Sequence, residues 1–138
     1  MKTEGLFAPE TREEARTQYE TVASGAGEVV RAVATSMSFD REEYGERVTD
    51  EVVDTAREAM FASLLEVTVG TREEFEQWSQ THEYAIFEIG GDNVNNVVWH
   101  AAPFAETVVA ATFQNEREAA VGTLRRQAFG RIYSEVLQ

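Results

Sequence analysis

The chain of 138 residues contains no cysteine, two histidines, two prolines and a single lysine, Lys2. A chain without cysteine forms no disulfides, has no thiol nucleophile and binds no metal through sulfur. No apolar run approaches the ~20 residues that cross a bilayer, and the first residues lack the basic and apolar regions of a secretory signal. We therefore expect a cytoplasmic protein that makes no contact with a membrane.

Acidic residues outnumber basic residues by 25 to 12, and the formal net charge is −13 at pH 7. Self-repulsion of this kind opposes folding at low salt, whereas molar salt shortens the Debye length to ~3 Å and screens it. An acidic chain with almost no lysine is typical of a halophilic protein whose stability rises with salt. The same charge disfavours nucleic-acid binding, because phosphate contacts weaken as salt rises.

The first half of the chain has the pattern of helices. Apolar residues spaced three or four apart form one stripe, which consists of Ala15, Tyr19, Val22, Ala26, Val29, Val33 and Met37. The stripe predicts either one helix over about 9–38, bent near Gly25 and Gly27, or two helices that meet there. We favour the single bent helix. Asp40 and Thr49 are expected to cap two further helices, over about 40–47 and 49–63.

The second half combines strands with helices. Strands are predicted over 64–70, 83–89, 96–102 and 107–113, with turns at 90–95 and 103–106, and the short links favour antiparallel pairing. Thr71 and Glu74 occupy the positions of a capping box for a short helix, and Asn115 is the expected cap of a final helix that reaches Leu137. These patterns predict a single α+β domain over 1–138. It has N-terminal helices (about 9–63), followed by a roughly four-stranded, mainly antiparallel sheet and a long C-terminal helix (about 64–138).

Three segments carry a family resemblance. The strings "TFQNEREAAVGTLRRQAFGRIY", "VVWHAAPFA" and "FDREEY" resemble a family of small, acidic haloarchaeal proteins that has no assigned function. The similarity extends over nearly the whole chain. The resemblance implies a haloarchaeal cytoplasmic protein, and it supplies no catalytic residues to transfer.

Alternation along the strands predicts two faces of the sheet. Val97, Trp99 and Ala101 are assigned to the core face, together with Val109 and Ala111 of the last strand. The opposite face is expected to carry a largely apolar set with one histidine, which consists of Tyr84, Ile86, Val98, His100, Val108, Ala110 and Thr112. This second face is too apolar for open water, so a helix, a partner or a ligand must cover it.

Arg125 is the unusual arginine of the last helix. A projection at 100° per residue places Arg125 inside the apolar arc, between Ile132 and Val136, whereas Arg126 lies at its rim. We interpret Arg125 as a buried or half-buried side chain paired with a carboxylate or with carbonyl groups. The alternative is an arginine in a cleft that binds a carboxylate or a phosphate.

The sequence contains no HExxH, Walker or GxSxG motif, and its two histidines, His82 and His100, lack helical ligand spacing. We therefore assign no catalytic residue, no metal and no cofactor. The sequence favours a non-enzymatic module that binds a protein partner or forms a homo-oligomer through the sheet surface, with Arg125 beside it. The alternative is a small anionic-ligand-binding protein or hydrolase-like enzyme, with His100 as acid or base and Arg125 holding the anion.

Overall fold

The computed structural model describes residues 1–91 and 93–137. Its elements are β1 (Lys2–Glu4), α1 (Arg12–Ala23), α2 (Ala26–Ser36), α3 (Arg41–Arg47), α4 (Asp50–Ser63), β2 (Val67–Thr71), α5 (Arg72–Gln80), β3 (Ala85–Ile89), β4 (Asn96–Ala102), the 3-10 turn η1 (Pro103–Ala105), β5 (Thr107–Phe113), α6 (Arg117–Ala128) and the π-helical segment η2 (Phe129–Tyr133). The α+β class is confirmed. The predicted turn over 90–95 includes Asp92, which lies outside the described residues.

Local signals position most of the helix starts. Asp40, Thr49 and Thr71 each accept a hydrogen bond from the backbone N–H three residues further along, as expected of N-caps. The expected cap at Asn115 is wrong. Helix α6 begins one residue later than that cap requires, after Glu116, whose side chain makes no capping hydrogen bond.

The preference for a single bent helix over 9–38 is also wrong. Helix α1 ends at Ala23 and α2 begins at Ala26, with Gly25 as the residue that precedes α2. Glycine is one of the poorest helix formers, so the chain breaks here although the apolar stripe keeps its phase. The alternative of two helices describes this segment correctly.

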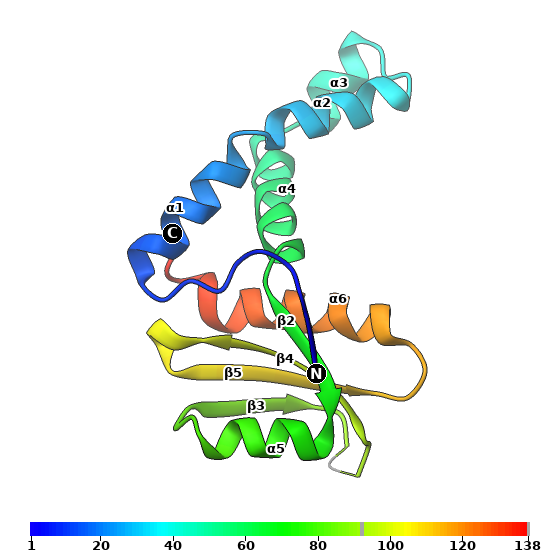
Figure 1. Cartoon of the computed structure of the whole chain (residues 1–138). Helices are drawn as coiled ribbons and strands as arrows, with labels where there is room; N and C mark the ends of the chain where they lie inside the picture. The colour runs from blue at the N-terminus through cyan, green and yellow to red at the C-terminus, as the bar shows by residue number, and fades with distance from the viewer. Residues whose placement is uncertain (92, 138) are drawn as a thin grey trace.

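The sheet has five strands in the order β1-β2-β4-β5-β3 and is mixed, because β3 runs parallel to β5 (Figure 1). The prediction of four mainly antiparallel strands therefore missed β1 and misplaced β3. Strand β4 pairs with β2 on one side and β5 on the other, so both of its edges are occupied. Strand β3 therefore pairs with the remaining edge of β5, where its direction is parallel.

The pairing of β4 with β5 corrects the predicted faces. His100 is opposite Val109, and Trp99 is opposite Ala110. Residues directly opposite each other lie on the same face, so Val109 belongs with His100 and not with Trp99. The predicted faces correspond to a register of β4 and β5 that differs by one residue from the observed register, and such a difference moves every side chain of a strand to the other face. The predicted surface therefore does not exist as one face.

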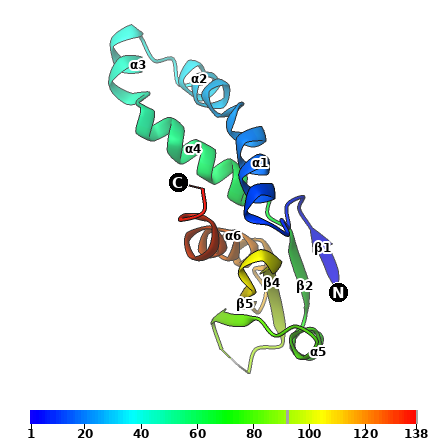
Figure 2. The same ribbon diagram turned by 90° about the vertical axis from the view of Figure 1, so that its left-hand side faces the viewer.

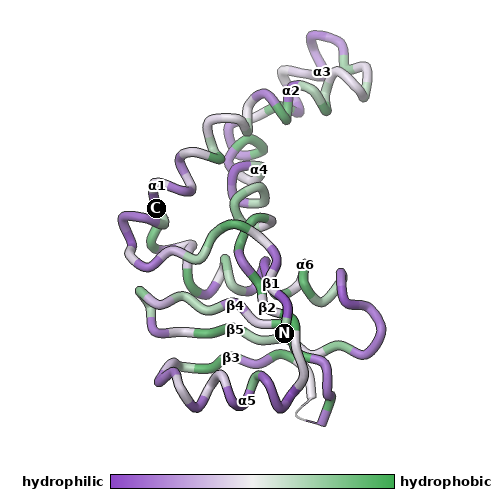
Figure 3. Tube along the Cα trace, in the orientation of Figure 1, coloured by the Kyte–Doolittle hydropathy of each residue, from purple (hydrophilic) through white to green (hydrophobic). Residues whose placement is uncertain are grey.

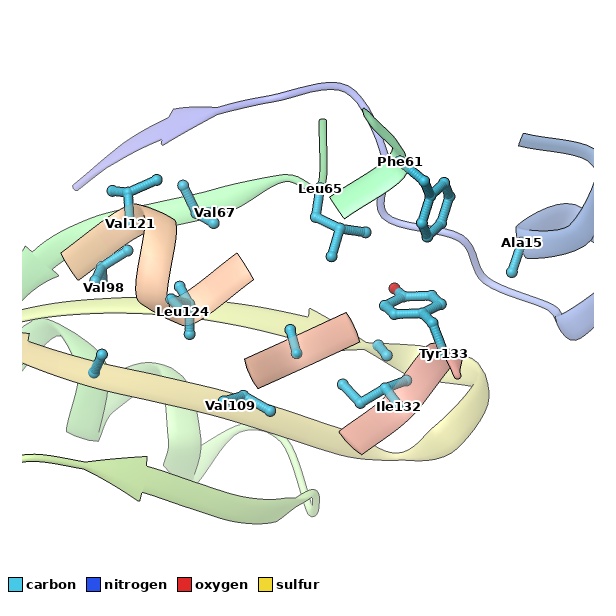
Figure 4. Packing of buried hydrophobic residues seen from close by; sticks show 13 residues of the cluster. Ala15, Phe61, Leu65, Val67, Val98, Val109, Val121, Leu124, Ile132 and Tyr133 are labelled. Atoms are coloured by element: carbon cyan, nitrogen blue, oxygen red, sulfur yellow. The ribbon is translucent and has the colours of Figure 1, made fainter. Parts of the chain in front are cut away.

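Each face of the sheet is covered by a helix. Helix α6 and segment η2 pack on one face, where Phe61, Leu65, Val98, Leu124 and Tyr133 form part of the main core (Figure 4). Helix α5 packs on the other face and forms a second core, whose buried residues are Phe75, Val97, Trp99, Val108 and Ala110. Burial of both faces explains the nearly continuous apolar sequences of β4 and β5.

The C-terminal helical region covers 17 residues, from Arg117 to Tyr133, which is shorter than the predicted helix to Leu137. Its last five residues form the π-helical segment η2. Among the described residues, we find no helix with both the length and the apolar character needed to cross a bilayer.

Helices α2 and α3 and the first turns of α4 project away from the sheet (Figures 1 and 2). We call residues 26–58 the arm. Helix α1 packs along α4 nearer the sheet, and α2 packs along α4 further out. Phe61 joins the base of α4 to the main core, where its ring lies 5.3 Å from that of Tyr133.

Candidate functional site

The structure separates the six candidate site residues, which are Tyr84, Ile86, Val98, His100, Val108 and Arg125. Val98 and His100 lie under α6, whereas Val108 lies in the second core under α5, and all three are at most 1% exposed. Tyr84 packs against the second core and is partly buried. Ile86, on the outer strand β3, is 48% exposed and is the only one of the six residues classed as exposed. Helices cover both faces of the sheet, so neither face is a free binding surface.

His100 is held by hydrogen bonds at both ring nitrogens. Nδ1 lies 2.6 Å from the carbonyl oxygen of Glu66, and Nε2 lies 2.7 Å from the hydroxyl oxygen of Tyr133. A carbonyl oxygen only accepts, so Nδ1 carries the proton, and in the neutral imidazole Nε2 then accepts from the tyrosine hydroxyl. A doubly protonated ring would instead donate from Nε2 to the hydroxyl oxygen, so the surroundings of the ring decide its charge.

Burial favours the same neutral form. Loss of solvation, opposed by the hydrogen bond to the Glu66 carbonyl and assisted by the nearby Arg125 guanidinium, lowers the pKa of His100 to about 4. Burial also raises the pKa of Tyr133, so its hydroxyl stays protonated. The pair is therefore a neutral hydrogen-bonded unit inside the core, without access to a substrate.

Arg125 is half-buried and makes its hydrogen bond beside that unit. Its Nε donates to the carbonyl oxygen of Leu65 at 3.0 Å, one residue before the carbonyl that accepts from His100. The two candidate site residues are thus brought together, and they hold consecutive carbonyls of the link between α4 and β2. Gly5 packs against the same Leu65 carbonyl with a φ of +100°, where a Cβ atom would lie 2.5 Å from the oxygen.

The other arginines of the last helix contact different parts of the molecule. Arg117 forms an ion pair with Glu4 of β1, which holds the pKa of that carboxyl group below its usual value. The guanidinium of Arg131 lies 4.8 Å from the ring centre of Phe87 on β3. Arg126 is exposed. Arg117 and Arg131 thus attach the C-terminal helical region to the two outer strands, β1 and β3, whereas Arg125 attaches it to the link between α4 and β2.

An apolar groove opens on the arm. It has a volume of about 330 Å³ and is lined by Val29, Val30, Val33, Ala34, Met37, Phe39, Arg47, Val48, Val52 and Ala56. Four of these apolar side chains remain exposed to water: Val29 (44%), Val33 (53%), Met37 (57%) and Val52 (41%). Hydrophobic residues continue along α2 and α4 well beyond the sheet (Figure 3). We call this surface the arm groove.

The sequence contained a signal for the arm groove that we interpreted differently. Val29, Val33 and Met37 belong to the apolar stripe of the first helices, which predicted helices without indicating what covers their apolar face. The stripe is real, but along α2 the sheet no longer lies beneath it (Figure 2). Periodicity shows that a face is apolar, and it does not show what covers that face.

A second hollow, of about 470 Å³, lies where β3 and β5 end, beside the start of α6. Thr112, Asn115, Glu116 and Thr123 contribute polar groups to its lining. Neither His100 nor any arginine lines it. Within residues 1–91 and 93–137, no group of three or more potential metal ligands is present.

These features define an α+β protein with a five-stranded mixed sheet, a helix on each face and a projecting helical arm. The chain belongs to DUF5809, a family of unknown function, which it matches over residues 6–134. The match covers the arm and every strand of the sheet except β1. No curated protein and no solved structure matches the chain.

Proposed function

We propose that this protein is a non-enzymatic interaction module that binds another protein chain through the arm groove. The observation that carries the proposal is the exposure of Val29, Val33, Met37 and Val52 around one apolar groove, on an arm that projects from the body. Contiguous apolar surface of this kind is characteristic of protein interfaces. The proposal keeps the interaction function inferred from the sequence and moves it from the sheet to the arm.

The geometry supports an enzyme or an anion-binding protein less well. His100 is 1% exposed, and both of its ring nitrogens already have partners. The Nε of Arg125 donates to a backbone carbonyl, so at least part of its guanidinium is engaged in the fold. Neither residue lines the arm groove or the hollow beside α6. An acid or base must reach its substrate within hydrogen-bonding distance, which His100 does not do here.

We further propose that the protein works in the cytoplasm of a halophile. The support is the excess of 25 acidic over 12 basic residues, with only one lysine. At high ionic strength the repulsion among these charges is screened, and an apolar groove then becomes the natural site of association.

The interaction function can be tested by photo-crosslinking in the native host. A photoreactive amino acid replaces Val33 on the arm groove, and in a second variant it replaces Ile86. Ile86 is the matched control, because it is also an exposed aliphatic residue but lies on β3. We expect crosslinks to a protein from position 33 and not from position 86. Crosslinks from position 86 alone would move the interface to the sheet edge, and an absence of protein crosslinks from both positions would refute the proposal.

A further inference from the structure

We propose that the occupant of the arm groove is a second copy of this chain, so that two arms pack face to face as a symmetric bundle of helices. This inference rests on the proposed function, because it names the partner of the same groove. It is carried by four features of the arm: its burial, its shape, its charge and its size.

The arm buries too little of its own apolar surface to be a self-sufficient unit. Between Gly27 and Met60, all of which the structure describes, Ala34 is the only buried residue. Helices α2 and α3 have 11 and 7 residues, and isolated helices shorter than about 12–15 residues are marginal in water. Their order therefore depends on packing, against α4 and against the occupant of the arm groove. A second copy is always available at the chain's own concentration.

The arm groove contains both parts of a self-complementary surface. Its lining combines the small side chains of Ala34 and Ala56 with the larger, protruding side chains of Val33 and Met37. In a two-fold dimer, each surface meets an identical surface turned by half a rotation. The protruding side chains of one copy can then enter the space above the alanines of the other. Pairing of two helical layers in this way produces the geometry of a helix bundle.

The charge of the arm does not mark it as a site for a basic partner. Residues 26–58 contain nine acidic residues and four arginines, and the rest of the chain contains sixteen acidic and eight basic residues. The ratio of acidic to basic residues is about two in both parts, so the acidity belongs to the whole surface. Two like-charged copies repel each other at low salt, and salt strengthens their association. A basic partner helix would show the opposite dependence, because salt weakens attraction between unlike charges.

The size of the arm fits a dimer of modest strength. A standard protein interface engages about 20–30 residues on each side. The arm spans 33 residues, and helices present about half of their residues to one side. The groove side of the arm therefore offers about 16 residues, just below this range, as expected of a weak dimer whose formation depends on the screening of charge.

The test is sedimentation of the purified chain at 0.1 M and 2 M KCl over a range of concentrations. We expect a dimer whose dissociation constant falls on the order of tenfold or more between the two salts. Val33→Glu and Met37→Glu, at positions more than half exposed, should each weaken the dimer on the order of a hundredfold at 2 M KCl. Ile86→Glu, on β3, is the matched control and should leave the dimer unchanged. Circular dichroism and thermal melts of each variant show whether its monomer is folded.

The remaining outcomes each overturn the proposal in a different way. A wild-type chain that stays monomeric at 2 M KCl excludes the second copy. In that case, crosslinks from position 33 to a different protein would still support the interaction function, so the two proposals fail separately. A dimer that survives both arm variants and is lost with Ile86→Glu would place self-association at the edge of the sheet. A dimer that weakens as salt rises would contradict the charge argument.

Discussion

Tyr133 and His100 form a hydrogen bond inside the core, with the tyrosine hydroxyl oxygen 2.7 Å from Nε2 of the imidazole. The two side chains come from η2 and β4, so the bond connects the last turn of the helical region with the centre of the sheet. Because the imidazole is neutral and protonated at Nδ1, the hydroxyl group is the donor. Three of the predictions below concern this cluster and its neighbour Arg125.

Removal of the tyrosine hydroxyl should destabilise the protein without opening a cavity. In Tyr133→Phe the ring keeps its contacts with Phe61, but Nε2 of His100 loses its donor in a buried site. We expect a loss of about 1–3 kcal/mol in the free energy of unfolding, measured with urea. Tyr19→Phe is the control, because Tyr19 is only partly buried and should change stability by less than about 0.5 kcal/mol. Equal effects at the two positions would contradict the assigned role of the hydroxyl group.

Stability should fall as pH decreases from about 6.5 to 4. The pKa of His100 is about 4 in the folded chain and about 6.5 when unfolded, so in this interval only the unfolded state gains the proton. Protonation of the unfolded state lowers the free energy of unfolding, by about 3 kcal/mol over the full interval. The contribution is fully present above pH 6.5 and is lost as pH falls.

The variant His100→Asn isolates this titration. Asparagine keeps an N–H donor near the position of Nδ1, which can reach the Glu66 carbonyl, and it does not ionise in this range. We expect a clearly shallower dependence of stability on pH between 6.5 and 4.5 in the variant. Denaturant unfolding at several pH values measures both slopes. Parallel curves for the two chains would mean that other groups cause the acid sensitivity.

Arg125→Ala should be much more destabilising than Arg126→Ala. Arg125 is half-buried and donates to the Leu65 carbonyl, so its removal leaves that acceptor without this donor. We expect a loss of about 1.5–3 kcal/mol for Arg125→Ala and less than about 0.5 kcal/mol for the exposed Arg126. Arg125→Lys should recover only part of the loss, because lysine lacks the planar group that carries Nε–H. Similar small losses for both alanine variants would refute the structural role of Arg125.

The melting temperature should rise with salt, by at least about 5 °C between 0.1 M and 2 M KCl. The reason is the net charge of −13, whose repulsion is screened at high ionic strength. A matched variant changes five exposed glutamates to glutamine, at Glu20, Glu46, Glu76, Glu83 and Glu135. Its melting temperature should depend less on salt. A wild-type melting temperature that is equal or lower at 2 M KCl would refute the halophile proposal.

Features that depend on neighbouring residues were predictable from the sequence. The caps at Asp40, Thr49 and Thr71 use hydrogen bonds that span three residues, and the position of Arg125 follows from helix geometry alone. The strands over 96–102 and 107–113 also match the structure, because their β-branched runs are local signals.

Features that depend on distant parts of the chain were not predictable in the same way. The pairing of His100 with Val109 and the parallel position of β3 depend on which edges other strands already occupy. The three residues of β1 are too few to show alternation, although they pair with β2. The arm groove was not predicted for a related reason. Val33 and Met37 have the same periodicity whether or not a core lies beneath them, so the sequence does not show that they are exposed.

The pairing of β1 with β2 has a consequence for how the chain folds. Lys2 is opposite Val69, so this strand pair closes a loop that contains α1, α2, α3 and α4. Closing so long a loop from an extended chain costs considerable entropy. Helices α1 and α2 lead outward and α4 leads back, so once they pair the ends of the loop lie near each other (Figure 2). Pairing of these helices thus lowers the entropic cost of pairing β1 with β2. We therefore expect the contacts between the helices to form before β1 joins the sheet.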